Sequence, residues 1–205
     1  LQTYSCSIHI NYFLALYLTK KKLISMDKVF NQTFAQTHKD IEFPKGNLEV
    51  VYPALDQPVS PGSQLKAKEV QETPSVKVFS SRIKKDALYT LIMSDIDASA
   101  EGCHYLVTNL HAVSENEDLV VMNKTKDDHT ILEYVPPGPR IEQNHAYVWL
   151  LFEGVPEASK ASAVNECRRG YGTNEKYHGA EWFKEVSGLG QLIAFNYQYV
   201  KNDLA

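Results

Sequence analysis

Four short segments decide the fold of this chain: Asp95-Ile-Asp97-Ala-Ser99, Cys103-His104-Tyr105, Tyr134-Val-Pro-Pro-Gly138-Pro139 and His145-Ala-Tyr147-Val-Trp-Leu-Leu-Phe152. The first segment follows an apolar run, and the second and fourth each open a run rich in β-branched and aromatic residues, which is typical of strands. Side chains at the ends of separate strands can converge on one pocket. The segments therefore predict a β-rich fold with a site at the ends of its strands.

Composition favours one globular domain. The chain has 205 residues, of which 43% are hydrophobic, enough for one sizeable core. With 21 basic and 25 acidic residues its net charge is −4, so no global charge favours nucleic acid or acidic lipid. The three cysteines lack metal-ligand spacing and are too few to staple a domain of this size. We expect a reducing compartment, the cytoplasm.

The N-terminus carries an apolar run from Ile8 to Leu18, followed by Lys20-Lys-Lys22. A bilayer span needs roughly 20 apolar residues, and a secretory signal has its positive charge before the apolar run. We therefore expect no membrane span, and instead an N-terminal helical extension at residues 1–25 that serves as a docking helix. A single domain at 26–205 should follow it.

The remaining elements are predicted from residue type and from turn signals. Strands are expected at Leu48–Tyr52, Val76–Phe79, Leu88–Met93, Tyr105–Leu110, Tyr147–Phe152 and Leu192–Val200, and helices at Glu157–Glu166 and His178–Val186. The run from Tyr147 to Phe152 is apolar throughout, as in a central strand buried on both faces. Residues 112–130 are polar overall and predict a hairpin-like surface excursion.

The polar residues of the four segments allow more than one chemistry. Asp95 and Asp97 could cap a turn, bind a cation or act as acid and base, and capping is the common role of Asp at a strand end. His104 and His145 can each donate to an anion when charged. Together with Asp95 and Tyr134, they predict a pocket for an anion or a small ligand.

Covalent and metal chemistry have less support. Ser99 lies in no Gly-x-Ser-x-Gly elbow, and Cys103 should point to the face opposite His104. No histidine pair or carboxylate pair at helical spacing predicts a metal site, so a metal-dependent hydrolase that uses Asp95 and His104 is the weakest alternative. We expect no enzyme activity, no metal and no cofactor.

At this point the segments resemble the phosphatidylethanolamine-binding protein family. Its pattern runs Asp-Pro-Asp-x-Pro, a His that opens a strand ending in Asn, Tyr-x-Gly-x-x-Pro, and His-Arg-Tyr before an apolar strand. Here the matching segments are Asp95–Ser99, His104–Asn109, Tyr134–Pro139 and His145–Phe152, in that order. Gly170-Tyr-Gly172-Thr, the segment Ile193–Tyr199 and the excursion at 112–130 look most like the fungal carboxypeptidase Y inhibitor branch.

The resemblance, which covers roughly residues 20–200, implies a mainly β fold. This would be a β-sandwich around a central antiparallel sheet, with a few short peripheral helices and an anion pocket at one end. Carried over by position, the ligand-binding residues would be Asp95, His104, Tyr134, Gly138, Pro139, His145 and Tyr147.

The sequence also departs from the family pattern at this pocket. Ile96 and Ser99 replace both prolines of the first element, so we expect the turn to be rebuilt, because non-proline cis peptides are rare. Pro136 replaces a glycine and forbids a positive φ. Ala146 replaces the arginine after the second histidine.

The lost arginine changes the charge balance. Asp97 loses the cation implied by the resemblance, and an unpaired buried carboxylate is costly. We therefore expect Asp97 to turn outward or to take a new donor such as Arg140. Affinity for phosphate or a phospholipid headgroup should be weak or absent.

The resemblance implies three functions, of which the first is preferred. The preferred function is a non-enzymatic binding protein that acts through protein–protein contacts, with a protease, a kinase or a large complex as partner. The second is a structural subunit of a large assembly such as the mitochondrial ribosome large subunit, with the mitochondrion as its compartment. The third is an anion-regulated inhibitor of a serine carboxypeptidase or a kinase.

Overall fold

The computed structural model describes residues 26–34, 41–111, 120–122, 129–140, 143–173 and 179–203. Within these ranges nine strands form one sheet: β1 (Gly46–Val51), β2 (Ser63–Lys66), β3 (Ser75–Phe79), β4 (Tyr89–Asp95), β5 (Gly102–Leu110), β6 (Val120–Met122), β7 (His129–Leu132), β8 (Asn144–Glu153) and β9 (Leu192–Lys201). The helical elements are residues 26–33, η1 (Ala67–Val70), α2 (Ala158–Glu166), η2 (Gly170–Gly172) and α3 (Gly179–Val186). The expected extension at residues 1–25 lies outside the described part of the chain.

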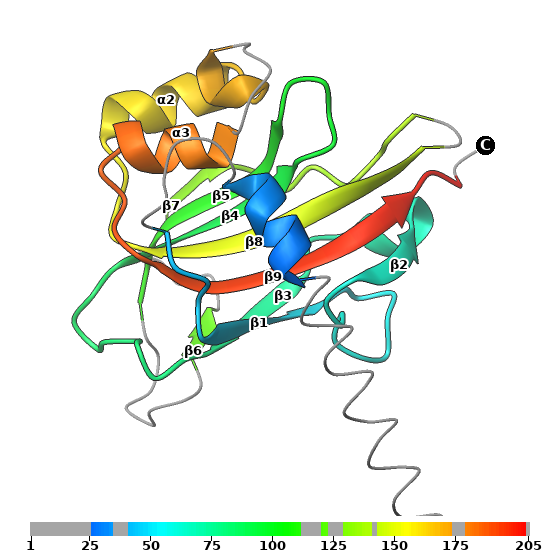
Figure 1. Ribbon diagram of the computed structural model, residues 1–205, viewed down its shortest axis with the longest axis horizontal. Coiled ribbons are helices and arrows are strands. Elements are labelled where there is room, and N and C mark those ends of the chain that lie inside the picture. The colour runs from blue at the N-terminus through cyan, green and yellow to red at the C-terminus, as the bar shows by residue number, and fades with distance from the viewer. Residues whose placement is uncertain are drawn as a thin grey trace, which may run out of the picture.

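The sheet has the strand order β6-β3-β1-β9-β8-β4-β5-β7, and β2 also pairs with β9 (Figure 1). Its centre is antiparallel, because β8 pairs antiparallel with both β9 and β4, and β4 does so with β5. At one side the pairing changes, since β1 and β2 both run parallel to β9. The mainly β class with a few short helices, expected from the sequence, is confirmed.

The strand β8 shows why the sheet has a core on each face. Its side chains alternate between two buried clusters: Tyr147, Trp149 and Leu151 lie in one, and Val148, Leu150 and Phe152 lie in the other. Strand geometry sends successive side chains to opposite faces. The fully apolar run is therefore buried on both sides, as the sequence predicted.

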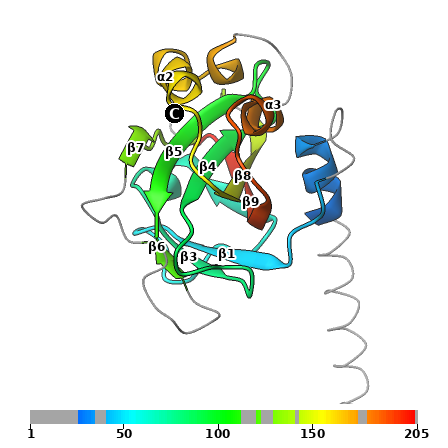
Figure 2. The same ribbon diagram turned by 90° about the vertical axis from the view of Figure 1, so that its left-hand side faces the viewer.

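The first cluster lies inside the curl of the sheet. There Leu48 and Val50 of β1 and Val76 and Val78 of β3 are buried in one cluster with Trp149 of β8. Figure 2 shows β1, β3 and β6 below and the strands β4, β5, β8 and β9 folded over them. The sheet thus curls onto itself and makes the two layers of a sandwich.

The second cluster lies between the sheet and the helices. Val164 of α2 and Phe183 of α3 are buried there, together with Phe30 from the helix at 26–33. Phe30 contacts Phe195 of β9 with ring centroids 5.7 Å apart. No helix within the described ranges has the length and apolar character needed to cross a bilayer.

The six predicted strands and two predicted helices are confirmed, with ends shifted by a few residues. Gly188, with φ 76°, follows the end of α3, as expected of a helix stop. Of the expected surface excursion at 112–130, the described residues after 111 lie in the two edge strands of the sheet, since β6 pairs with β3 and β7 pairs with β5. The sequence also missed β2 and the helix at 26–33.

Candidate functional site

Asp95 is the last residue of β4 and does two things at once. Its Oδ1 accepts hydrogen bonds from the backbone amides of Asp97 (3.1 Å) and Ala98 (3.0 Å), so it caps the turn that follows. The other oxygen, Oδ2, lies 2.9 Å from Nδ1 of His145 at the start of β8. Asp95 is only 5% exposed, so this contact is screened little by solvent. The carboxylate therefore holds the turn and His145 of β8 together.

His145 is held at both ring nitrogens. Besides the Nδ1 contact to Asp95, Nε2 lies 3.2 Å from Oε1 of Gln143. The ring also stacks on Tyr147, with centroids 6.5 Å apart. Both nitrogens of His145 thus already have protein partners.

Tyr147 completes the cluster around Asp95. Burial, the neighbouring negative charge of Asp95 and a hydrogen bond to that carboxylate raise the pKa of the Tyr147 hydroxyl well above its usual range. The backbone of Gly138 lies close to this hydroxyl and acts in the opposite direction, lowering its pKa. Of the seven predicted residues, the structure therefore joins Asp95, His145, Tyr147 and the backbone of Gly138 in one connected cluster.

His104 lies beside this cluster. Its Nδ1 is 2.8 Å from the carbonyl oxygen of Val135, which can only accept, so Nδ1 carries the hydrogen. The ring meets Tyr147 edge-on at 5.1 Å. Burial lowers the pKa of His104 below its usual value, and the positive charge of Arg168 acts in the same direction. A neutral His104 presents a lone pair at Nε2, which does not attract an anion.

Asp97 has new donors in place of an arginine. Its Oδ2 accepts from the backbone amide of Ala146 at 2.8 Å, and its Oδ1 accepts from Nε2 of Gln32 at 2.8 Å. The residue is exposed. Asp97 therefore turns outward, as expected, but the predicted donor Arg140 is wrong. The turn 95–99 contains only trans peptide bonds.

Two of the predicted residues make contacts elsewhere. The hydroxyl of Tyr134 donates to the carbonyl of Val70 at 2.7 Å, and its ring packs against Tyr105 at 6.0 Å. Pro139 is buried, and its carbonyl accepts from Nδ2 of Asn202 at 2.7 Å. Tyr134 and Pro139 thus anchor their loop to the rest of the domain.

The sequence missed a buried acid close to this site. Glu101 is 3% exposed, and its Oε1 accepts from Oγ of Ser94 at 2.5 Å and from the amide of Ala180 at 3.2 Å. Burial raises the pKa of Glu101 to about 7, and the charge of Asp95 adds to this effect. No local sequence signal marks this residue, since its amide donors come from the start of α3, far along the chain.

The described ranges contain no group of three or more His, Cys, Asp or Glu side chains that could hold a metal ion. The two residues considered for a metal-dependent hydrolase point to different partners. Asp95 pairs with His145, and His104 bonds to the carbonyl of Val135.

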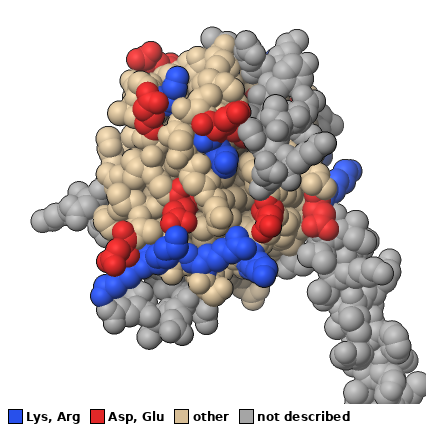
Figure 3. Space-filling model, turned by 60° about the vertical axis from the view of Figure 1, so that its left-hand side comes forward, with Lys and Arg blue, Asp and Glu red and all other residues tan. Residues whose placement is uncertain are grey.

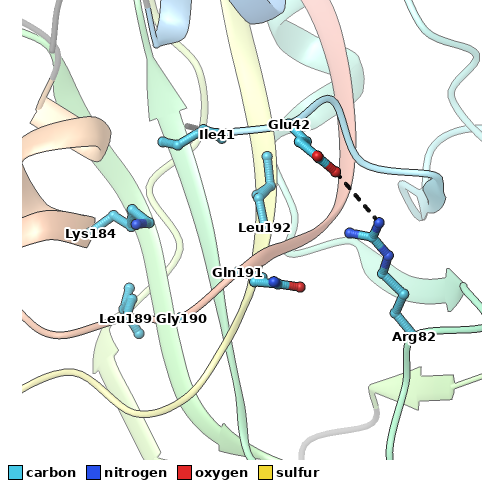
Figure 4. Close-up of a pocket in the computed structure, with 8 residues that line it drawn as sticks. All are labelled: Ile41, Glu42, Arg82, Lys184, Leu189, Gly190, Gln191 and Leu192. Atoms are coloured by element: carbon cyan, nitrogen blue, oxygen red, sulfur yellow. Dashed lines mark ion pairs between the residues drawn. The ribbon is translucent and has the colours of Figure 1, made fainter. Parts of the chain in front are cut away.

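Two cavities of about 350 Å³ each lie away from these residues. The first, here called the Arg82 cavity, has Arg82 and Lys184 on opposite sides and Leu192 between them (Figure 4). Arg82 forms an ion pair with Glu42 at 3.8 Å. None of the seven predicted residues lines either cavity.

The charged residues of one face are mixed in sign. Figure 3 shows Lys and Arg gathered in a band, with Asp and Glu beside it. Among the described residues, wherever they lie on the surface, pairs such as Lys84–Glu153 at 2.6 Å and Lys77–Glu49 at 3.6 Å bring opposite charges together. Such exposed pairs contribute little to stability, because solvent screens them.

Comparison with known proteins agrees with this architecture. The model of the family described as "Phosphatidylethanolamine-binding protein" matches residues 56–198. None of the curated proteins searched matches the chain. Among solved structures, a carboxypeptidase Y inhibitor in complex with its cognate proteinase is 24% identical, with a TM-score of 0.74 over 90% of this chain and 96% of that one.

A second solved structure, a phosphatidylethanolamine-binding protein from Plasmodium falciparum, is 16% identical. Its TM-score is 0.59, over 88% of this chain and 96% of that one. At these identities the two structures show a shared fold. The family model, in contrast, spans well over half of the sequence. This chain belongs to the phosphatidylethanolamine-binding protein family.

Proposed function

We propose that this chain is a non-enzymatic binding protein that acts through contacts with a protein partner. Its family pocket no longer recruits phosphate or a phospholipid headgroup with useful affinity. The observation that carries this proposal is the contact between Asp95 and His145 at 2.9 Å, because it uses the group that would otherwise bind an anion. The partner that the fold supports best is a carboxypeptidase.

The hydrogen bonds around Asp95 support the loss of headgroup binding. Asp95 lies against Nδ1 of His145 and Gln143 lies against Nε2, so an incoming phosphate would have to displace one of these two protein partners. A phosphate placed there would also meet the negative charge of Asp95. Within the described part of the chain, neither Asp95 nor Asp97 has a Lys or Arg ion-pair partner that could offset this repulsion.

The neutral state of His104 acts in the same direction. Its hydrogen is at Nδ1 and is used by the carbonyl of Val135, while burial opposes a second proton. A neutral imidazole with its lone pair toward a ligand is an acceptor, and a phosphate oxygen is also an acceptor. The two histidines therefore offer an anion no free donor.

The protein partner is inferred from the fold. The carboxypeptidase Y inhibitor that shares this fold was solved as a complex with its proteinase, and the similarity extends over 90% of this chain. A fold alone does not determine function. We therefore infer a carboxypeptidase as the partner class by analogy, and the experiment below tests it directly.

The pocket is tested by titrating phosphoethanolamine while the imidazole resonances of His104 and His145 are recorded. We expect no saturable shift at millimolar ligand when sodium chloride at equal ionic strength serves as the control. A saturable shift that disappears in His145→Gln would refute the loss of headgroup binding.

The partner is tested with the full chain and a purified carboxypeptidase Y. We expect one complex on size-exclusion chromatography and inhibition of peptidase activity, both unchanged by added phosphate. Absence of both a complex and inhibition overturns the carboxypeptidase assignment. Elution of the native chain in a large assembly at fixed stoichiometry would favour the structural-subunit function instead.

A further inference from the structure

The Arg82 cavity lies where segments far apart in the sequence meet. Arg82 comes from the loop between β3 and β4, Lys184 lies in the last turn of α3, and Leu192 is the first residue of β9. Residues 41–42, which precede β1, line a further side (Figure 4). The volume of about 350 Å³ falls within the range of small-molecule sites, roughly 300–1,000 Å³.

The loop that carries Arg82 is tied to the sheet. The amide of Arg82 donates to Oγ of Ser80 at 3.2 Å, and the amide of Lys84 donates to the hydroxyl of Tyr89 at 2.7 Å. The ammonium of Lys84 also pairs with Glu153, the last residue of β8, at 2.6 Å. The backbone of Arg82 is therefore held in place without a ligand, which lowers the cost of ordering it on binding.

The guanidinium of Arg82 has a weak partner. Its ion pair with Glu42 measures 3.8 Å, which is too long for a charge-assisted hydrogen bond of about 2.7–2.9 Å. The side chain of Glu42 is 83% exposed, whereas that of Arg82 is 33% exposed. A guanidinium presents several N–H donors in a planar fork that matches a carboxylate. A ligand carboxylate can therefore replace Glu42 and form the hydrogen bonds that Glu42 does not form.

The second cation is not paired. Lys184 is half-buried and has no ion-pair or hydrogen-bond partner in the part of the chain that the structure describes. Its position in the last turn of α3 is favourable for a positive charge, because helix carbonyls face it there. The ammonium therefore stays charged, and its donors are available to an anion.

The surface between the two cations is apolar. Leu189 and Leu192 are 5% and 4% exposed, and Ile41 packs against the same buried cluster. Figure 4 shows Leu192 between Arg82 and Lys184. Because the leucines already belong to the core, this floor is formed without a ligand. It can cover the hydrocarbon part of a molecule whose two ends are charged.

The position of the charges decides the class of ligand. The two cations lie on opposite sides of the floor, so a compact anion such as phosphate would reach one of them and leave the other without a partner. A molecule with a negative charge at each end and a short apolar chain in between would use both cations and the floor. Such a molecule also has to compete with Glu42, the acid that lines the cavity.

We propose that the Arg82 cavity is a binding site for a small organic dianion, a dicarboxylate with a short hydrocarbon chain. One carboxylate displaces Glu42 and bonds to Arg82, and the other pairs with Lys184. The chain between them lies on Leu189 and Leu192. This site is separate from the family pocket and does not depend on the proposed contact with a carboxypeptidase.

The test uses variants of the full chain that change one charge each. Arg82→Gln and Lys184→Gln remove one cation, and Glu42→Gln removes the competing acid. Lys85→Gln is the matched control, because Lys85 is an exposed lysine of the same loop that does not line the cavity. All four side chains are at least partly exposed, so melting temperatures close to that of the parent chain should show that the fold is kept.

The probes are succinate, glutarate and adipate, with butyrate and inorganic phosphate for comparison, all at constant ionic strength. We expect at least one dicarboxylate to shift the backbone amide resonances of Gly190 and Leu192 in a saturable manner. Loss of one charge-assisted contact should weaken that binding about tenfold in Arg82→Gln and in Lys184→Gln. Glu42→Gln should tighten it, by up to about fivefold, and Lys85→Gln should leave it unchanged.

Three results would overturn the proposal. The first is the absence of a saturable shift with all three dicarboxylates at millimolar concentration. The second is equal affinity in the parent chain and in both cation variants. The third is butyrate or phosphate binding as tightly as the best dicarboxylate, because two separated cations predict a preference for two separated negative charges.

Discussion

Glu101 makes the stability of this protein depend on pH in a direction that is unusual for a carboxylate. Most paired carboxylates stabilise the fold as they ionise, whereas burial raises the pKa of Glu101 from 4.5 to about 7. The folded chain therefore keeps this proton to a higher pH than the unfolded chain does. Between about pH 4.5 and 7 the folded state binds more protons, so this group's contribution to stability falls as pH rises.

The size of the effect follows from the two pKa values. One pKa unit is worth about 1.4 kcal/mol, so the difference between 4.5 and about 7 corresponds to roughly 3 kcal/mol. The value applies without a discount for solvent screening, because Glu101 is 3% exposed. Glu101→Gln imitates the protonated acid, since its amide oxygen can still accept from Ser94 and Ala180.

The assay is urea unfolding followed by tryptophan fluorescence at several pH values. The free energy of unfolding of Glu101→Gln minus that of the parent chain should rise by about 3 kcal/mol between about pH 4.5 and 8. Taking this difference cancels the contributions of the other titrating groups, which both chains share. One of them is His104, whose lowered pKa makes its contribution to stability fall toward acid pH. Glu166→Gln, a change at an exposed carboxyl, should give a flat difference.

A flat difference curve for Glu101→Gln would refute this reasoning. It would mean that the donors from Ser94 and the start of α3 stabilise the charged form as much as burial opposes it. A difference that falls with pH would show that the carboxylate is the favoured form in the fold, and that the direction of the pKa is wrong.

Three further predictions concern the sheet and the candidate site. Gly46→Ala should destabilise the fold by roughly 1–3 kcal/mol in urea unfolding, because its Cβ would lie 2.4 Å from the carbonyl oxygen of Ile193. Gly138→Ala, whose Cβ meets nothing within 4 Å, is the matched control and should be near neutral. Asp97→Ala leaves two donors without their acceptor and should cost about 1–2 kcal/mol; an unchanged midpoint contradicts this. His104 should titrate below its usual pKa with its hydrogen at Nδ1, which nitrogen NMR measures, and a raised midpoint would contradict the role of burial.

The long strands could be predicted from the sequence because their residues are apolar, β-branched or aromatic, and such residues are buried in sheets. Every position from Tyr147 to Phe152 is apolar, and the structure buries all of them. The strands β2, β6 and β7 have only three or four residues each, too few for alternation to show. Their place in the sheet depends on partners far along the chain, as with β6 and β3.

The sequence predicted several residues that the structure brings together in the candidate site, but it did not predict which hydrogen bonds these residues form. Asp95, His145 and Tyr147 stand at strand ends in the sequence, and pairing of β4 with β8 brings them together. The sequence could not identify the donors of Asp97, because Gln32 lies 65 residues away on a helix that was not predicted. Glu101 was missed because its amide donor, Ala180 at the start of α3, lies 79 residues along the chain.

The contacts of Asp97 show how the chain tolerates the loss of the arginine at position 146. A carboxylate that loses its cationic partner lowers the stability of the fold when it stays buried. Here Asp97 is exposed and accepts two hydrogen bonds, one from the Ala146 amide of β8 and one from Gln32 of the helix at 26–33. The same carboxylate that faces an arginine in the family pattern now ties a helix to the central sheet. With Ala at position 146, Asp97 therefore attaches the helix at 26–33 to the sheet and has no unpaired buried charge, so the fold tolerates the departure from the family pattern.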